Sequence, residues 1–262
     1  MIRALNAAAT GMYSQSLYID TIANNLANVN TTGFKRARME FQDLVYQTLR
    51  TGGSQQDLGA VLPTELQIGH GSRPVSTQKS FEQGNTVPTG NPLDVAIDGD
   101  GFFQVSKPDG QVFYTRDGSF KMSPEGELVS SDGYALEPVI TLPQDTQDVT
   151  IARDGTVSVL LPGEIEPEIV GQFELARFVN PAGLHNLGQN LLGETVASGP
   201  PILLNPGNEG MGGVTQGFLE SSNVQIVEEM VAMIATQRAY EVASKAVRTA
   251  EELLQIANQL KR

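Results

Sequence analysis

Two stretches of this chain, one near each end, repeat apolar residues every seven positions. A repeat of this length places a narrow apolar stripe along a helix, and such a stripe needs a partner helix. The repeats consist of Leu5, Met12, Ile19 and Leu26 near the N-terminus, and of Ile226, Met233, Tyr240, Val247 and Leu254 near the C-terminus. We therefore expect the two ends to pair as a coiled coil, with the rest of the chain projecting as an insertion.

The two helices are expected to run from Ile2 to about Val29 and from Ser221 to Leu260. The first is followed by an Asn- and Thr-rich stretch that closes at a glycine, and these residue types favour the ends of helices. Ser222 with Gln225 three positions later has the form of a capping box, which predicts the start of the second helix.

Apolar residues also lie outside the two stripes, for example Leu17 in the first helix and Val227 and Val231 in the second. A hairpin of two helices cannot bury all of them, so the surplus predicts contacts with neighbouring subunits. Packing against the chain's own β domain is the alternative. Because an isolated helix pair buries little apolar area, we expect both ends to be largely disordered in the monomer and to fold on polymerisation.

The middle of the chain predicts a different structure. Between Asp94 and Leu204, short runs of β-forming residues alternate with Asp-Gly pairs, which are strong hairpin signals and indicate an antiparallel β domain. The pairs begin at Asp98, Asp100, Asp109, Asp117, Asp132 and Asp154. Thr51–Arg73 shows neither a helical nor a strand period, and long segments of this kind are functional or disordered. The predicted fold class is therefore α+β.

We divide the chain into three parts. Residues 1–35 with 221–262 form the terminal helical domain, and residues 81–204 form the β domain. Residues 36–80 with 205–220 form a connecting domain that includes an irregular or β-hairpin insertion at 46–75.

The formal net charge of −13 argues against a nucleic-acid or anionic-membrane partner, because no basic stripe is present to neutralise phosphates. The chain has no cysteine, which excludes disulfides and thiolate metal sites. Its first residues do not form a secretory signal, and no apolar run approaches the length of a membrane span. We expect no cofactor, no metal and no membrane insertion.

The residues give little support to catalysis. His70 and His185 are the only histidines and lie far apart in turn-like contexts, and neither a nucleophile elbow nor a Walker loop is present. The Asp98–Gly101 run lacks the later ligands of a calcium loop, so tight turns explain it better. Composition leaves open a glycan hydrolase that uses an Asp/Glu pair, but this alternative does not explain the terminal repeats. We predict that the protein is not an enzyme.

Three segments resemble the flagellar axial proteins, which are the rod, hook and hook-associated proteins. The stretch ANNLANVNTTGFKR at 23–36 is similar to the motif that closes their N-terminal helix. AIDGDGFFQV with YTRDGSF resembles the start of their β domain, and residues 217–247 resemble their C-terminal helix. Within the first stretch, the matching motif residues are Asn24, Asn25, Leu26, Asn28, Thr32, Gly33 and Phe34. The segment 44–74 resembles an insertion of the distal-rod branch, with a proximal-rod or hook protein as the nearest competitor.

The resemblance implies a structural subunit that polymerises helically into a rigid, hollow drive shaft across the periplasm, in the basal body. It implies that the helices form an inner tube around the export channel, that the β domain forms the outer layer and that the insertion contacts neighbouring subunits. The implied partners are other copies, proximal-rod and hook proteins, the P and L rings and the type III export apparatus. Phe41 and Val45 fit the family's export-recognition pattern, with amphipathic packing as the alternative. Export is expected without a cleaved signal peptide.

Overall fold

The computed structural model describes residues 2–51, 64–163, 166–208 and 210–259. The chain forms two compact units. The first consists of 1–26, 37–78 and 225–262, and the second consists of 27–36 and 79–224. Both α-helices lie in the first unit and most of the strands lie in the second, which confirms the α+β class.

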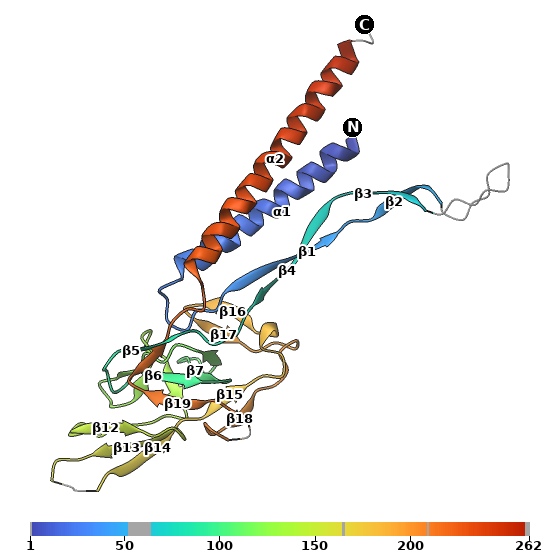
Figure 1. The fold of residues 1–262 in the computed structure, drawn as a ribbon. Coiled ribbons are helices and arrows are strands. Elements are labelled where there is room, and N and C mark those ends of the chain that lie inside the picture. The colour runs from blue at the N-terminus through green and yellow to red at the C-terminus, as the bar shows by residue number, and fades with distance from the viewer. Residues whose placement is uncertain (1, 52–63, 164–165, 209, 260–262) are drawn as a thin grey trace. The chain divides into compact units, whose positions relative to one another are not determined.

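The first unit is built on two antiparallel helices, α1 (Ile2–Ala27) and α2 (Ile226–Gln259). α1 runs toward a common base, and α2 runs away from it (Figure 1). They are about 40 and 50 Å long. None of the described helices is both long and apolar enough to cross a membrane. α2 begins at Ile226, later than the predicted start at Ser221. The prediction that Ser222 and Gln225 form a capping box is therefore wrong. Ser222 Oγ instead accepts a hydrogen bond from Val224 N at 3.3 Å, in the extended segment before the helix.

Two antiparallel ribbons complete the first unit. Strand β1 (Ala37–Asp43) pairs with β4 (Ser72–Lys79), and β2 (Tyr46–Arg50) pairs with β3 (Leu66–Gly69). The β1–β4 ribbon lies against α1, because the rings of Tyr18 and Phe41 meet edge to face at 5.9 Å. The segment predicted as irregular or as a β-hairpin is thus a ribbon over its described part, while residues 52–63 lie outside the described residues.

The second unit contains a nine-stranded antiparallel sheet. Its main path runs β16-β17-β8-β7-β11-β10-β9, and β15 pairs with both β7 and β18. These strands are β7 (Phe102–Ser106), β8 (Val112–Thr115), β9 (Lys121–Met122), β10 (Leu128–Val129), β11 (Ala135–Glu137), β15 (Leu175–Arg177), β16 (His185–Gly188), β17 (Leu191–Gly193) and β18 (Ile202–Leu204).

Smaller sheets pack around it. One has three strands, β12 (Asp148–Ile151), β13 (Thr156–Leu160) and β14 (Glu168–Gln172). Two pairs join distant parts of the chain, β6 (Val95–Asp98) with β19 (Gly213–Gln216), and β5 (Thr86–Pro88) with β20 (Phe218–Glu220). A short 3₁₀ helix, η1 (Pro181–Gly183), follows β15.

Three of the six Asp-Gly pairs form the predicted hairpins. Gly110, Gly133 and Gly155 have φ near +80° and connect β7 to β8, β10 to β11 and β12 to β13. The prediction is wrong for the other three pairs. Gly99 and Gly101 lie between β6 and β7, which do not pair with each other, and Gly118 packs closely against the carbonyl of Val95.

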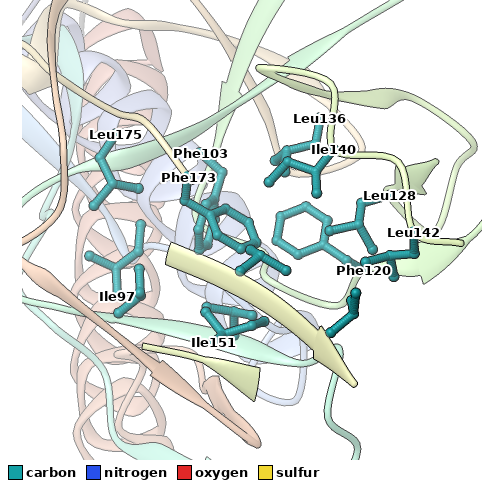
Figure 2. Close-up of a cluster of buried hydrophobic side chains, with 14 of the residues drawn as sticks. Ile97, Phe103, Phe120, Leu128, Leu136, Ile140, Leu142, Ile151, Phe173 and Leu175 are labelled. Carbon is teal, nitrogen blue, oxygen red and sulfur yellow. The ribbon is translucent and has the colours of Figure 1, made fainter. Parts of the chain in front are cut away.

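The core of the second unit is aromatic and aliphatic. Figure 2 shows Phe103, Phe120 and Phe173 gathered at its centre, with the Phe103 and Phe120 rings edge to face at 5.0 Å. Aliphatic side chains surround them from several strands and loops, among them Ile97, Leu128, Leu136, Ile140, Leu142, Ile151 and Leu175. This core gives the second unit its own hydrophobic interior.

Candidate assembly surfaces

The largest group of exposed apolar side chains among the described residues of the first unit lies on α2. Val227 is 74% exposed and Val231 is 62% exposed, values far above those of core residues. The other exposed apolar side chains of this helix are Ile226, Met230, Ile234, Tyr240, Val242, Leu253 and Ile256. Unless the second unit covers them, these side chains require contact with another chain to leave water.

The predicted coiled-coil residues occupy both helices. Leu5, Met12, Ile19 and Leu26 are half-buried on α1, as are Met233, Val247 and Leu254 on α2, whereas Ile226 and Tyr240 are exposed. Near the base of the two helices, Asn25 Nδ2 donates a hydrogen bond to Glu229 Oε2 at 3.2 Å. The assignment of the repeats to a coiled coil stays a prediction.

Asn25 is the residue of the motif that organises the first unit. Its side chain is almost completely buried and pairs with the backbone of Ala37 in both directions, Nδ2 donating to the carbonyl at 2.8 Å and Oδ1 accepting from the amide at 2.9 Å. With its bond to Glu229, it ties the end of α1, the start of β1 and the start of α2 together. An asparagine amide provides the donors and the acceptor that such a junction needs.

Asn28, Thr32, Gly33 and Phe34 of the motif lie in the second unit. Gly33 has φ of +67°, and a Cβ atom there would lie 2.6 Å from Asp117 N, so only glycine fits. Thr32 Oγ1 donates to Asp117 Oδ1 at 3.0 Å, and Phe34 is buried beneath the ammonium of Lys79 at 5.3 Å. These contacts explain why the motif has a glycine at position 33 and a phenylalanine at position 34.

The other two motif asparagines have smaller roles. Asn28 turns the chain after α1, since its Oδ1 accepts from Thr31 Oγ1 at 3.1 Å and its carbonyl accepts from Thr31 N at 3.2 Å. Asn24 is exposed on α1.

A buried ionic cluster follows the motif directly. Glu220 Oε1 accepts from Lys35 Nζ at 2.6 Å and from Gly84 N at 2.8 Å, while Oε2 accepts from Arg116 Nη1 at 3.3 Å. All three charged side chains are at most 4% exposed. Burial lowers the pKa of Lys35 and of Arg116, and the Glu220 carboxylate opposes both shifts. The single carboxylate of Glu220 is therefore the shared ionic partner of two buried cations, Lys35 and Arg116.

Asn223 joins the neighbouring chain segments. Its Oδ1 accepts from Arg36 N at 2.7 Å, and its Nδ2 donates to the carbonyls of Ser80 and Glu82 at 2.9 and 3.1 Å. Sequence reasoning identified neither Asn223 nor the members of the ionic cluster. The available signal was that Lys35, Glu220 and Asn223 lie inside the two segments that resemble known motifs, GFKR and GFLESSN.

The proposed export residues lie at the β1–β2 junction. Phe41 is 40% exposed and leans on Tyr18, whereas Val45 is 81% exposed. Val45 also offers its carbonyl to His70 Nδ1 at 2.9 Å, so this histidine has a structural contact on the ribbon. His185 lies exposed on β16, in the second unit.

Comparisons with known protein families match three parts of the chain. A family model described as "Flagella basal body rod protein" matches residues 5–35, and "Flagellar hook protein FlgE/F/G D1 domain" matches residues 96–159. A third, "Flagellar basal body rod FlgEFG protein C-terminal", matches residues 215–260. The matched regions include α1 with its motif, the start of the β domain and α2.

Relatives extend the match to the full length. The flagellar basal-body rod protein FlgG of Borreliella burgdorferi is 51% identical over all of this chain and all of that protein. FlgG of Buchnera aphidicola, strain APS, is 48% identical over 99% of this chain, and FlgG of Bacillus subtilis is 39% identical over its full length. The hook protein FlgE of Helicobacter mustelae is 39% identical over 52% of this chain but over 30% of its own length.

Terminal helices around an inserted β domain, together with these family matches, define an axial protein of the bacterial flagellum. Within that class, the chain belongs to the flagellar basal-body rod protein FlgG family. It is therefore a structural subunit of the flagellar rod, and the relatives named here give no support to the glycan-hydrolase alternative.

Proposed function

We propose that the chain polymerises helically into the rigid, hollow distal rod, which surrounds the export channel and transmits motor torque to the hook. It has no catalytic role in this proposal. Its partners are other copies, the proximal-rod and hook proteins, the surrounding P and L rings and the type III export apparatus. Phe41 and Val45 provide export recognition without a cleaved signal peptide, supported by their exposure on the ribbon.

The observation that carries the proposal is the apolar surface of α2. Complete burial of one valine or isoleucine side chain contributes about 1.5–3 kcal/mol. Several such side chains on one helix therefore provide a large driving force for association when neighbouring copies cover them. The coiled-coil pairing of the terminal repeats belongs to the same proposal, as does the placement of the helices as an inner tube inside an outer β layer.

The three-part division of the chain is retained within this proposal. The terminal domain assembles the tube, the β domain forms its outside and the ribbon of the connecting domain contacts neighbouring subunits. An isolated two-stranded ribbon is marginally stable in water, and β2 and β3 are exposed throughout, apart from Gly69. Contact with other copies would stabilise the ribbon and cover its exposed strands.

The test is concentration-dependent sedimentation of the full chain. Wild type should change from monomer to polymer as concentration rises, and Val231→Glu should raise the required concentration at least tenfold by placing a charge on the apolar surface. Gln255→Glu, at an exposed polar position of the same helix, is the matched control and should behave like wild type. Equal polymerisation of Val231→Glu and wild type would refute the proposal.

The nearest competing identity is a proximal-rod or hook protein. The ribbon separates the two, because we assign it the stiffness of a distal rod. Deletion of residues 51–73 should leave assembly intact and yield a more flexible polymer in electron micrographs. An unchanged bending stiffness would remove the distal-rod assignment while leaving the axial role in place.

A further inference from the structure

The net charge of the protein is confined almost entirely to one of its two units. The second unit contains 20 acidic and 8 basic residues, whereas the first contains 10 and 9. The difference is larger at the surface, since 12 acidic but only 2 basic side chains are exposed among the described residues of the second unit. Copies of this unit therefore repel one another across most of their surfaces.

One part of the second unit escapes this pattern. Residues 178–208 contain a single charged side chain at neutral pH, Glu194. The same stretch exposes five large apolar side chains, Val179, Leu187, Val196, Ile202 and Leu203. We call Val179, Val196, Ile202 and Leu203 the neutral face.

Hydrogen bonds bring the parts of the neutral face together. Asn180, directly after Val179, donates from Nδ2 to the carbonyl of Ala197, directly after Val196, at 3.0 Å. Ile202 and Leu203 belong to β18, whose residue Ile202 is paired with Arg177 at the end of β15. Within the described residues, β18 pairs only with β15, so it is an edge strand of the large sheet.

We infer that the neutral face is where the second unit of one copy contacts the second unit of another. This inference rests on the proposed polymer, which brings many anionic units close together. Charges are screened over about 8 Å at physiological ionic strength, so contact across an acidic surface would place carboxylates inside that distance. Contact across the neutral face buries exposed apolar side chains, and the stretch 178–208 brings a single carboxylate to it, that of Glu194. A basic partner protein would instead be attracted to the acidic surface.

The absence of cysteine from the chain makes a direct test possible. A photoreactive benzophenone maleimide can be attached to the single thiol of a Val196→Cys variant of the full chain. The matched control is Ile169→Cys, an exposed apolar position on β14 beside Glu168 and outside the neutral face. A Val231→Cys variant reports helix contacts between copies, which belong to the proposed function.

After concentration and illumination, peptide mapping should show Val196→Cys linked to the second unit of another copy. The yield should be at least fivefold above that of Ile169→Cys. If only Val231→Cys gives links between copies, the inference is overturned and the proposed function stands. If only Val196→Cys gives such links, the inference stands and the proposed helix contacts are overturned. A link from Val196→Cys to the first unit, or no intermolecular link, would also overturn the inference.

Discussion

Replacement of Glu220 by glutamine should destabilise the second unit strongly. The carboxylate is 2% exposed, and its two oxygens face Lys35 and Arg116. A glutamine of the same shape must turn its NH₂ group toward one of these cations, which would then face a donor. Breaking a buried ion pair at one partner costs about 3–5 kcal/mol. That cost is a large share of the roughly 5–15 kcal/mol that stabilises a typical domain.

Hydrogen exchange measured by mass spectrometry on the full chain provides the assay. The amides of β7 lie in the core and report the global opening of the unit. At about 1.4 kcal/mol per tenfold change, Glu220→Gln should reduce their protection by roughly 100-fold to 4,000-fold. Glu194→Gln, at an exposed position, should change it by less than about threefold.

A double-mutant cycle identifies the cause. In a Lys35→Met background, one of the two cation contacts of Glu220 is already absent, so Glu220→Gln should cost less than it does in wild type. Protection of β7 within threefold of wild type in the single Glu220→Gln variant would refute the reasoning.

Asn25→Leu should lower the hydrogen-exchange protection of amides at the start of β1 by about 2–4 kcal/mol, because Ala37 loses both of its hydrogen-bond partners. Asn30→Leu, on an exposed turn, is the control and should leave this protection unchanged. Equal protection in the two variants would contradict the role of Asn25 at the junction. Gly33→Ala should destabilise the second unit by at least about 2 kcal/mol in urea, because its φ is positive and its Cβ meets backbone; an unchanged midpoint would disprove this. Burial lowers the pKa of Lys79, so the unfolded chain holds its proton more tightly. The free energy of unfolding should therefore rise with pH between the lowered native pKa and about 10.5, and Lys79→Met should reduce that slope, whereas an identical slope would contradict the burial.

Sequence patterns predicted the helices because their signal is local. A repeat of seven such as Leu5 to Leu26 follows from helix geometry, whatever the rest of the chain does. Asp-Gly pairs predicted hairpins correctly at some positions and wrongly at others. The turn at Gly110 is local, whereas the position of Gly118 depends on close packing against the carbonyl of Val95, which is distant in the sequence. A dipeptide reports a conformational preference and not the strand that follows it.

Local sequence patterns could not predict the contacts of Asn25 and Glu220. Asn25 was part of a motif, but its partners Ala37 and Glu229 lie 12 and 204 positions away. Likewise, nothing near Glu220 in the sequence indicates that Lys35 and Arg116 meet it. Charged residues are predicted to be exposed by default, because burial of an unpaired charge is costly, and the pairing appears only in the fold.

Electron cryo-microscopy of the assembled polymer would show whether the terminal helices build the inner tube. We predict that α1 and α2 of every copy line the central channel, and that helices of neighbouring copies cover the apolar surface around Val227 and Val231. A polymer in which the β domain lines the channel would contradict this prediction, as would one in which these valines remain exposed to solvent.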